Sequence, residues 1–411
     1  MVARMSLIVS AFLLVLSVCA CSAFATNGMN MISYGGEASG MAGASLGVSD
    51  DAYALNNNPA GMSQIQNMDI SFGISLLMPN LNHSDMFGND VDGESAIFPL
   101  PSVSFVRKLP DLKLSYGIGL FAQGGMGAQF KNLTTAFGTT DETYTNVAYM
   151  KLAPSVSYEL TETVFVGAAL NVGYSTMKLR FFPNTSVPGT FAGMNMKDVY
   201  GLGYGGKFGI MVKASEVVTV GLVYTTQSAL NYKHGTMTFS GMGDYACSVD
   251  GFNWPQSFGA GISFRPNEQW IFAVDTTWVN WSKAMDTVVI MTTAPTPMDT
   301  VTFPMKWKDQ IVIAVGASCK INERWTVRGG WNYGKNPIPN ENLSPLFPAI
   351  VEHHVTFGVS YAFNNEWSFD FALEHGFSKK VIYTNAGAPF GNNAIESHDQ
   401  NTIHLYFERK F

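Results

Sequence analysis

Charged residues are scarce in this chain of 411 residues. Asp, Glu, Lys and Arg together make up 13% of it, whereas a soluble protein carries about 25%, so charge is too sparse to cover two or three soluble domains. Beyond the first ~20 residues the chain also lacks the ~18-residue apolar run from which a spanning helix is recognised. Hydrophobic residues nevertheless reach 46%. This combination favours a transmembrane β-barrel, which spreads apolar side chains over alternate strand positions.

Positive charge and cysteine are also in short supply. The net charge of −7 excludes nucleic acid binding by bulk electrostatics. Cys19 and Cys21 fall in the expected export segment, and Cys247 and Cys319 are too far apart in sequence for us to expect a disulfide. The cysteines and the seven histidines show no metal-ligand or catalytic-triad spacing. We therefore predict no metal, no cofactor and no catalytic residue.

Residues 1–25 are predicted to be a signal peptide. Arg4 supplies the positive start, residues 7–18 the apolar centre, and Ala23-Phe24-Ala25 a small-x-small cleavage site. Two alternatives stay open: an N-terminal anchor helix, and lipidation at Cys21. Export places the mature chain outside the inner membrane.

From residue 67 to 411 the dominant pattern is period two. Apolar side chains at Met68, Ile70, Phe72 and Ile74 alternate with small or polar ones, and similar runs start near Val164, Trp270 and Trp367. The runs approach the ~9–11 residues that a tilted strand needs to cross a bilayer. We count about fourteen of them, which predicts an all-β, antiparallel transmembrane barrel.

Connections between these runs alternate in length. Short gaps fall at 108–111, 159–162, 213–216, 265–268, 320–324 and 364–366, and long gaps near 79–97, 126–143, 180–200, 228–253, 281–306, 334–350 and 378–400. Short periplasmic turns and long external loops are typical of barrels in the outer membrane of Gram-negative bacteria. There the wall would contact outer-membrane lipid and lipopolysaccharide.

The chain ends on a strand with a terminal aromatic residue. Ile403, Leu405 and Phe407 alternate with polar side chains before the terminal Phe411. This pattern resembles the signal by which barrel proteins reach their assembly machinery, which we expect to bind Phe411.

Two segments depart from the barrel pattern. Residues 26–66 are rich in Gly, Ala, Ser and Asn without alternation, and they could be a disordered periplasmic tail or a plug in the lumen. The long gaps 180–200 and 228–253 carry apolar residues that could cap the barrel, capture a hydrophobic ligand, or do both. They include Phe181, Phe182, Phe191, Met194, Met196, Met237 and Phe239.

Short motifs along the mature chain resemble the FadL/TodX (OMPP1) family of outer-membrane transporters. They include residues 40–44, 49–52, 58–62, 152–158, 254–255, 278–282, 307–309 and 336–339. The resemblance implies that residues 26–66 form a hatch inside a fourteen-stranded barrel, with Asp50, Asp51, Asn58, Pro59 and Ala60 in the hatch motif. It also implies an inward kink in the third strand, where this chain has Gln123, Gly124, Gly125 and Gly127 in place of the usual Pro. Glycine tolerates the dihedral angles that such a bend requires.

These observations predict a monomeric, non-enzymatic, passive transporter of long-chain fatty acids or of aromatic or aliphatic hydrocarbons. Ligands would be captured by the loops, bound in the lumen and released laterally through the gap at the third strand. The alternatives are a general porin for polar solutes, a barrel enzyme acting on lipid, and an adhesin.

Three cations are expected inside the lumen. Alternation places Lys151, Lys207 and Arg328 inward. Each could bind a ligand carboxylate, and we name Lys151 and Arg328 as candidate ligand-binding residues. Each could instead pair with an inward acid such as Asp275, Asp370 or Glu374.

Overall fold

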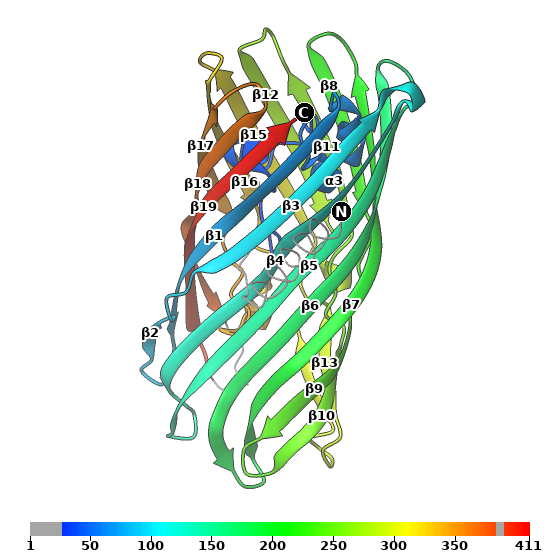
Figure 1. The fold of residues 1–411 in the computed structure, drawn as a ribbon. Helices are drawn as coiled ribbons and strands as arrows, with labels where there is room; N and C mark the ends of the chain where they lie inside the picture. The colour runs from blue at the N-terminus through cyan, green and yellow to red at the C-terminus, as the bar shows by residue number, and fades with distance from the viewer. Residues whose placement is uncertain (1–26, 384–389) are drawn as a thin grey trace.

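The computed structural model describes residues 27–383 and 390–411, which form one antiparallel sheet closed into a barrel (Figure 1). Of the 19 strands, β2 (Asp90–Asp92), β9 (Asn231–Phe239), β10 (Gly243–Asp250), β13 (Thr287–Thr292) and β14 (Thr300–Pro304) lie in hairpins beyond one end. The other 14 make the wall. They are β1 (Met68–Ser84), β3 (Phe98–Leu109), β4 (Leu114–Thr134), β5 (Thr140–Glu159), β6 (Val164–Val187), β7 (Phe191–Lys213), β8 (Val218–Thr225), β11 (Ser257–Phe264), β12 (Trp270–Val279), β15 (Gln310–Lys320), β16 (Trp325–Gly334), β17 (His353–Ala362), β18 (Trp367–Tyr383) and β19 (Ala394–Lys410).

Closure comes from pairing of the first wall strand with the last. β1 pairs with β19 from Asp69↔Lys410 to Ser84↔Ile395, so the sheet closes into a cylinder and its first and last strands are not free edges. The predicted fold class is therefore confirmed. The predicted signal peptide and Cys21 lie outside the described residues, and Cys247 and Cys319 are free thiols, as expected.

In the part of the chain that the structure describes, six short helices accompany the strands. They are α2 (Gly36–Gly40), α3 (Ala54–Asn57), η1 (Pro59–Gln64), η2 (Pro110–Leu112), α4 (Trp281–Ala284) and η3 (Asn340–Asn342). None of the helices in the described ranges is long and apolar enough to cross a membrane.

The predicted short turns match the structure, but several predicted long loops are wrong. Most of 126–143 and 180–200 is strand, since β4 runs to Thr134 and β6 to Val187. β4 to β7 contain 21, 20, 24 and 23 residues, about twice the ~9–11 that cross a bilayer. Beyond the bilayer the buried side chains of β6 are apolar, as at Met177 and Leu179, and the exposed ones are polar, as at Lys178, so the outward apolar face that marks a membrane strand is lost there.

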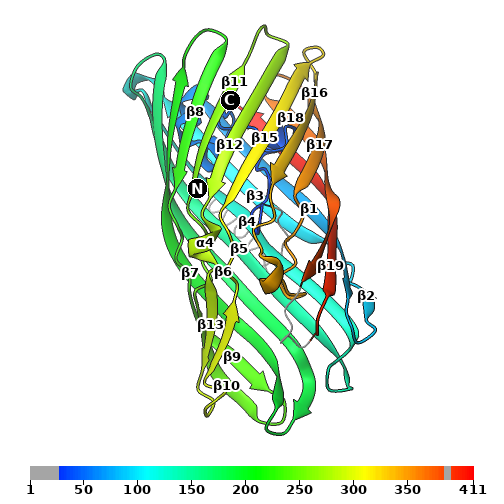
Figure 2. The same cartoon turned by 180° about the vertical axis from the view of Figure 1, so that it is seen from behind.

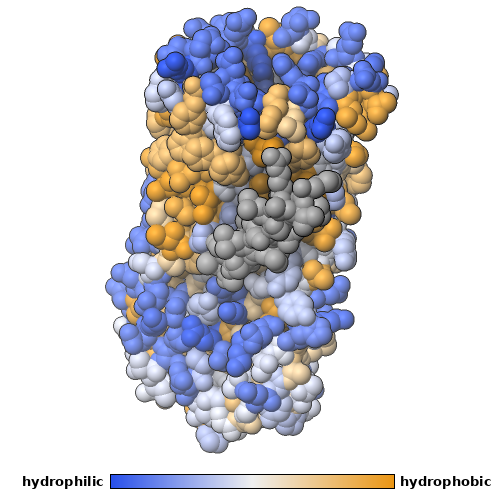
Figure 3. Space-filling view, in the orientation of Figure 1, coloured by the Kyte–Doolittle hydropathy of each residue, from blue (hydrophilic) through white to orange (hydrophobic). Residues whose placement is uncertain are grey.

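The membrane belt lies on the half of the wall nearer the short turns. In Figure 3 an apolar band runs below a polar rim, and the opposite end is mainly polar. On β6 the exposed apolar side chains are Leu170 and Tyr174, whereas Phe181, farther along the strand, is buried. The wall therefore projects well beyond the outer face of the bilayer.

The N-terminal segment, residues 27–66, lies inside the barrel. Its short helices are surrounded by wall strands in opposite views (Figure 1, Figure 2). Met29, Met41, Tyr53 and Met62 on this segment are at most 1% exposed. The interior is therefore occupied by the chain's own leading residues.

Candidate functional site

β4 leaves its neighbour halfway along the wall. The β3–β4 pairing runs from Leu109↔Leu114 to Ser102↔Phe121 and stops there. The β4–β5 register then shifts between Ala122 and Gly124. Side chains along β4 alternate between buried and exposed up to Gly119, but every residue from there to Ala128 is buried. β4 therefore bends inward at the position expected for the kink, and Gln123, Gly124, Gly125 and Gly127 all lie in the bent stretch.

The N-terminal segment binds directly to this bend. Gly124 has φ of 150°, and a Cβ there would lie 2.2 Å from the Met29 carbonyl oxygen. That oxygen accepts a hydrogen bond from the Gly125 N–H at 3.1 Å. Glycine is thus required at position 124 by both its conformation and this close approach.

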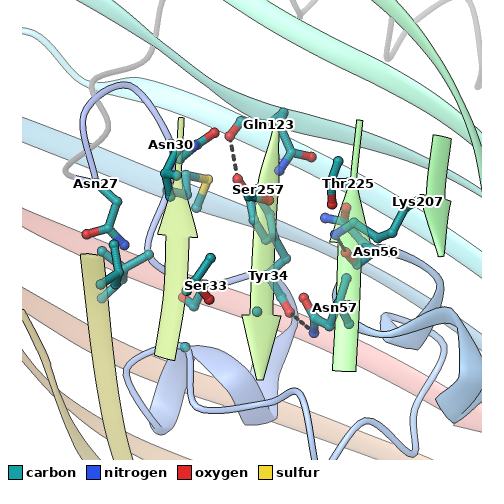
Figure 4. A pocket seen from close by; sticks show the side chains of 18 of the residues that line it. Asn27, Asn30, Ser33, Tyr34, Asn56, Asn57, Gln123, Lys207, Thr225 and Ser257 are labelled. Atoms are coloured by element: carbon teal, nitrogen blue, oxygen red, sulfur yellow. Dashed lines mark hydrogen bonds between the residues drawn. The ribbon is translucent and has the colours of Figure 1, made fainter. Parts of the chain in front are cut away.

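Tyr34 adds to this contact, and Asn30 binds Trp254 close by; Figure 4 shows Tyr34 and Asn30 beside Gln123. The Tyr34 hydroxyl donates to the Gln123 carbonyl at 2.6 Å. Trp254 Nε1 donates to Asn30 Oδ1 at 2.7 Å, and its ring stacks on Tyr149 with centroids 4.3 Å apart. The sequence motif at 254–255 includes Trp254 but carries no sign of its hydrogen bond to Asn30, which joins positions 224 residues apart.

The Asn58-Pro59-Ala60 motif fixes the other end of the segment to the wall. Asn58 Oδ1 accepts from the Ala60 N–H at 3.2 Å, which caps η1. Asn58 Nδ2 donates to the carbonyls of Leu46 and of Ile210 on β7. On β6, a Cβ at Gly167 would lie 2.3 Å from Pro59 carbonyl carbon. The motif can therefore approach the wall closely because position 167 is a glycine.

Charged side chains hold the middle of the segment. Arg328 on β16 lies 3.3 Å from Asp370 and 3.7 Å from Glu37, so it joins wall to segment. Asp50 pairs with Arg265 at 3.0 Å. Asp51 accepts from the Tyr53 N–H at 2.8 Å, a local turn contact. For Arg328 the structure therefore has the ion pair that the sequence offered as the alternative to ligand contact.

The other two inward acids are also occupied. Asp275 Oδ2 accepts from the Ser45 and Leu46 N–H groups at 2.7 and 2.8 Å. Glu374 lies 3.1 Å from both His404 Nε2 and Gln400 Nε2. Neither acid forms an ion pair with Lys151 or Lys207 within the described ranges.

Those two lysines line a lumen cavity of about 170 Å³ (Figure 4). Lys151 is 4% exposed, and Lys207 Nζ donates to the Asn56 carbonyl of α3. Tyr149 and Trp254 contribute aromatic surface to the same cavity, and Gln123 of the β4 bend also lines it. The cavity thus lies between the N-terminal segment, the wall and the bend.

The apolar residues proposed for ligand capture lie in strands, not in loops. Phe181 and Phe182 are on β6, Phe191, Met194 and Met196 on β7, and Met237 and Phe239 on β9. All but Phe191 are buried in one cluster, in which Phe181 and Phe182 stack at 4.8 Å and Phe191 packs against both. This is the mutual packing expected of a cap. None of them lines the lumen cavity, so ligand capture stays a prediction.

Known proteins with similar sequences and structures share this architecture. Residues 13–404 match the family model described as outer membrane protein transport protein (OMPP1/FadL/TodX). Long-chain fatty acid transport proteins of Salmonella typhi and Escherichia coli (strain K12) are 22% and 23% identical over 81% of this chain and 84% of theirs. The crystal structure of the P. putida toluene transporter TodX superposes with a TM-score of 0.79 at 22% identity, covering 92% of this chain and 99% of that one.

The family model spans nearly the whole chain, and the closed barrel has the same fold as TodX. The protein is thus located in the outer membrane, and its relatives act in transport rather than in enzymatic catalysis. The chain belongs to the OMPP1/FadL/TodX family of outer membrane transport proteins.

Proposed function

We propose that this protein admits hydrophobic compounds into the cell envelope by passive diffusion in three steps. Ligands are captured at the outer apolar cluster, bind in the lumen cavity, and leave sideways where β4 separates from β3. One observation carries the proposal: Gln123 belongs both to the cavity lining and to the bend in β4. A ligand in the cavity therefore lies next to the one stretch of β4 that has left its β3 partner.

The segment of residues 27–66 acts as a hatch in this proposal. It occupies the lumen at the turn end, which closes straight passage to the periplasm and leaves the gap beside β4 as the proposed way out. Burial stabilises a hydrophobic ligand by roughly 0.8 kcal/mol per methylene, which is enough for capture without any covalent step or energy input. The fatty acid and toluene transport named for the relatives supports the same class of ligand.

Three further partners belong to the proposal. Phe411 is 42% exposed at the end of β19 and is available to the barrel assembly machinery. The apolar belt contacts outer-membrane lipid, and the polar wall above it contacts lipopolysaccharide. The barrel closes on itself, so we infer that it works as a monomer.

The decisive experiment replaces Gly124 and Gly125 together by Val. The new side chain at position 124 would clash with Met29 and press β4 toward a regular strand. Uptake of radiolabelled oleate and toluene by cells should fall toward background, while the barrel still assembles and shows heat-modifiable mobility in gels. Gly329→Val on β16 is the matched control, because a Cβ there would have its nearest neighbour 3.7 Å away.

Unchanged uptake in the double variant would exclude the lateral route. A large steady current through the purified protein in planar bilayers would favour a general porin instead. Mass spectrometry of ligand retained during purification would identify the compound carried.

A further inference from the structure

The lumen cavity carries more positive than negative charge. Its lining includes Lys151 and Lys207 and one carboxylate, Asp275. The lysine ion pairs of the described chain involve other lysines. Burying a cation without a counter-ion is costly, and a second cation on the same cavity adds to that cost. The arrangement favours an anion from outside the chain.

Asp275 does not neutralise the pair. Its Oδ2 is engaged by two backbone N–H groups of the N-terminal segment. Its Oδ1 is buried without a partner and packs against Gly261, where a Cβ would lie 2.0 Å from it. The one acid in the cavity lining thus binds the backbone of residues 45–46.

The register places the two lysines on either side of a third polar group. Lys151 on β5 pairs with Gly173 of β6, and Lys207 on β7 pairs with Ala169 of the same strand. Asn171 lies between those two positions, is 2% exposed and lines the cavity, and its Nδ2 is the side-chain atom that can donate. Three adjacent strands therefore present two ammonium groups and a carboxamide, all of which donate hydrogen bonds.

Part of the remaining lining suits a small apolar body. The stacked rings of Tyr149 and Trp254 and the side chains of Val223, Val279 and Val312 face the same space. The volume of about 170 Å³ is close to the ~150 Å³ of an apolar cavity that holds one benzene molecule. A single ring or a short chain fits this space.

We propose that the lumen cavity binds small carboxylates with a ring-sized apolar body, the carboxylate being held by Lys151 and Lys207. This inference rests on the proposed function, since it names the ligand class of the same cavity. The apolar body lies toward Tyr149 and Trp254, on the side of the β4 bend. Asn171 donates to the second carboxylate oxygen.

Calorimetry on the full-length protein in an uncharged detergent tests the proposal with benzoate and with benzyl alcohol, its uncharged match. Benzoate should bind at least about tenfold more tightly, since hydrogen bonds to charged groups contribute more than neutral ones. Lys151→Met should weaken benzoate binding by about ten- to a hundredfold and leave benzyl alcohol unaffected. Lys233→Met, at an exposed position of β9, is the control and should change neither.

Lys151→Arg keeps the charge and should restore part of the benzoate affinity, which a purely structural role for Lys151 would not produce. Equal affinity for the two probes, or full benzoate binding by Lys151→Met, would overturn the inference. If toluene uptake still depends on Gly124 and Gly125 in that case, the proposed function stands without it. If no probe binds and no uptake occurs, both are wrong.

Discussion

Asp275 is the side chain whose removal should loosen the N-terminal segment most specifically. It is 4% exposed and accepts from the N–H groups of Ser45 and Leu46 at 2.7 and 2.8 Å. Hydrogen bonds to a charged group contribute about 1.5–3 kcal/mol each, so Asp275→Ala should cost roughly 3–6 kcal/mol locally. That corresponds to about a hundred- to ten-thousandfold faster amide exchange if local opening governs the rate.

The assay is hydrogen–deuterium exchange read by mass spectrometry over residues 43–50. Asp275→Asn keeps an acceptor oxygen without the charge and should show an intermediate rate. Asp309→Ala is the control, because Asp309 also accepts from a backbone N–H, that of Ser282 at 3.1 Å, yet belongs to the outer region. If Asp275→Ala and Asp309→Ala gave the same exchange over 43–50, Asp275 would not anchor the segment.

Three other perturbations have defined outcomes. Gly167→Val would push a side chain into Pro59 and should lower the thermal midpoint of the barrel and speed exchange over 58–64, whereas unaltered exchange there would mean the motif does not depend on this contact. Arg328→Met leaves Glu37 and Asp370 unpaired and should cost about 3–5 kcal/mol in urea unfolding, while Lys131→Met, which breaks the exposed pair with Glu94, should cause no measurable change. Burial raises the pKa of Glu352, but hydrogen bonds from Lys379 Nζ and the Asn336 N–H outweigh burial and hold it below the ordinary value of 4.5. A lowered pKa stabilises the fold fully above 4.5, and this contribution is lost as pH falls from there through the lowered pKa. Protection of residues 336–352 should therefore fall in acid, and Lys379→Met should complete this loss at higher pH.

The wall could be predicted from sequence because its signal is local. Alternation at residues 68–74 follows from one face meeting lipid and the other the lumen, and the turn between Glu159 and Val164 follows from a break in that alternation. The outer extensions escaped prediction because neither face meets lipid there. Phe181 and Phe191 were assigned to a loop for this reason, although their strands pair beyond the bilayer.

The lumen contacts could not be predicted from periodicity. Ser45 and Asp275 are 230 positions apart, and Asn30 and Trp254 are 224 apart. Alternation predicts that Asp275 points inward, but its partner is a backbone N–H that carries no sequence signature. For the same reason the sequence could not identify the partners of Lys151 and Arg328. An inward cation has the same sequence pattern whether its side chain pairs with Asp370 or lines a cavity.

The contacts that hold the N-terminal segment differ in strength along its length. Residues 37–50 are tied by Arg328, Arg265 and Asp275, all through charged groups. Residues 29–34 are tied to the β4 bend and to Trp254 by neutral hydrogen bonds, which contribute about 1 kcal/mol each. A ligand that gains ~0.8 kcal/mol per buried methylene can offset the weaker set without breaking the stronger one. In the function proposed here, entry to the gap beside β4 and closure of the barrel toward the periplasm would therefore depend on different parts of a single segment.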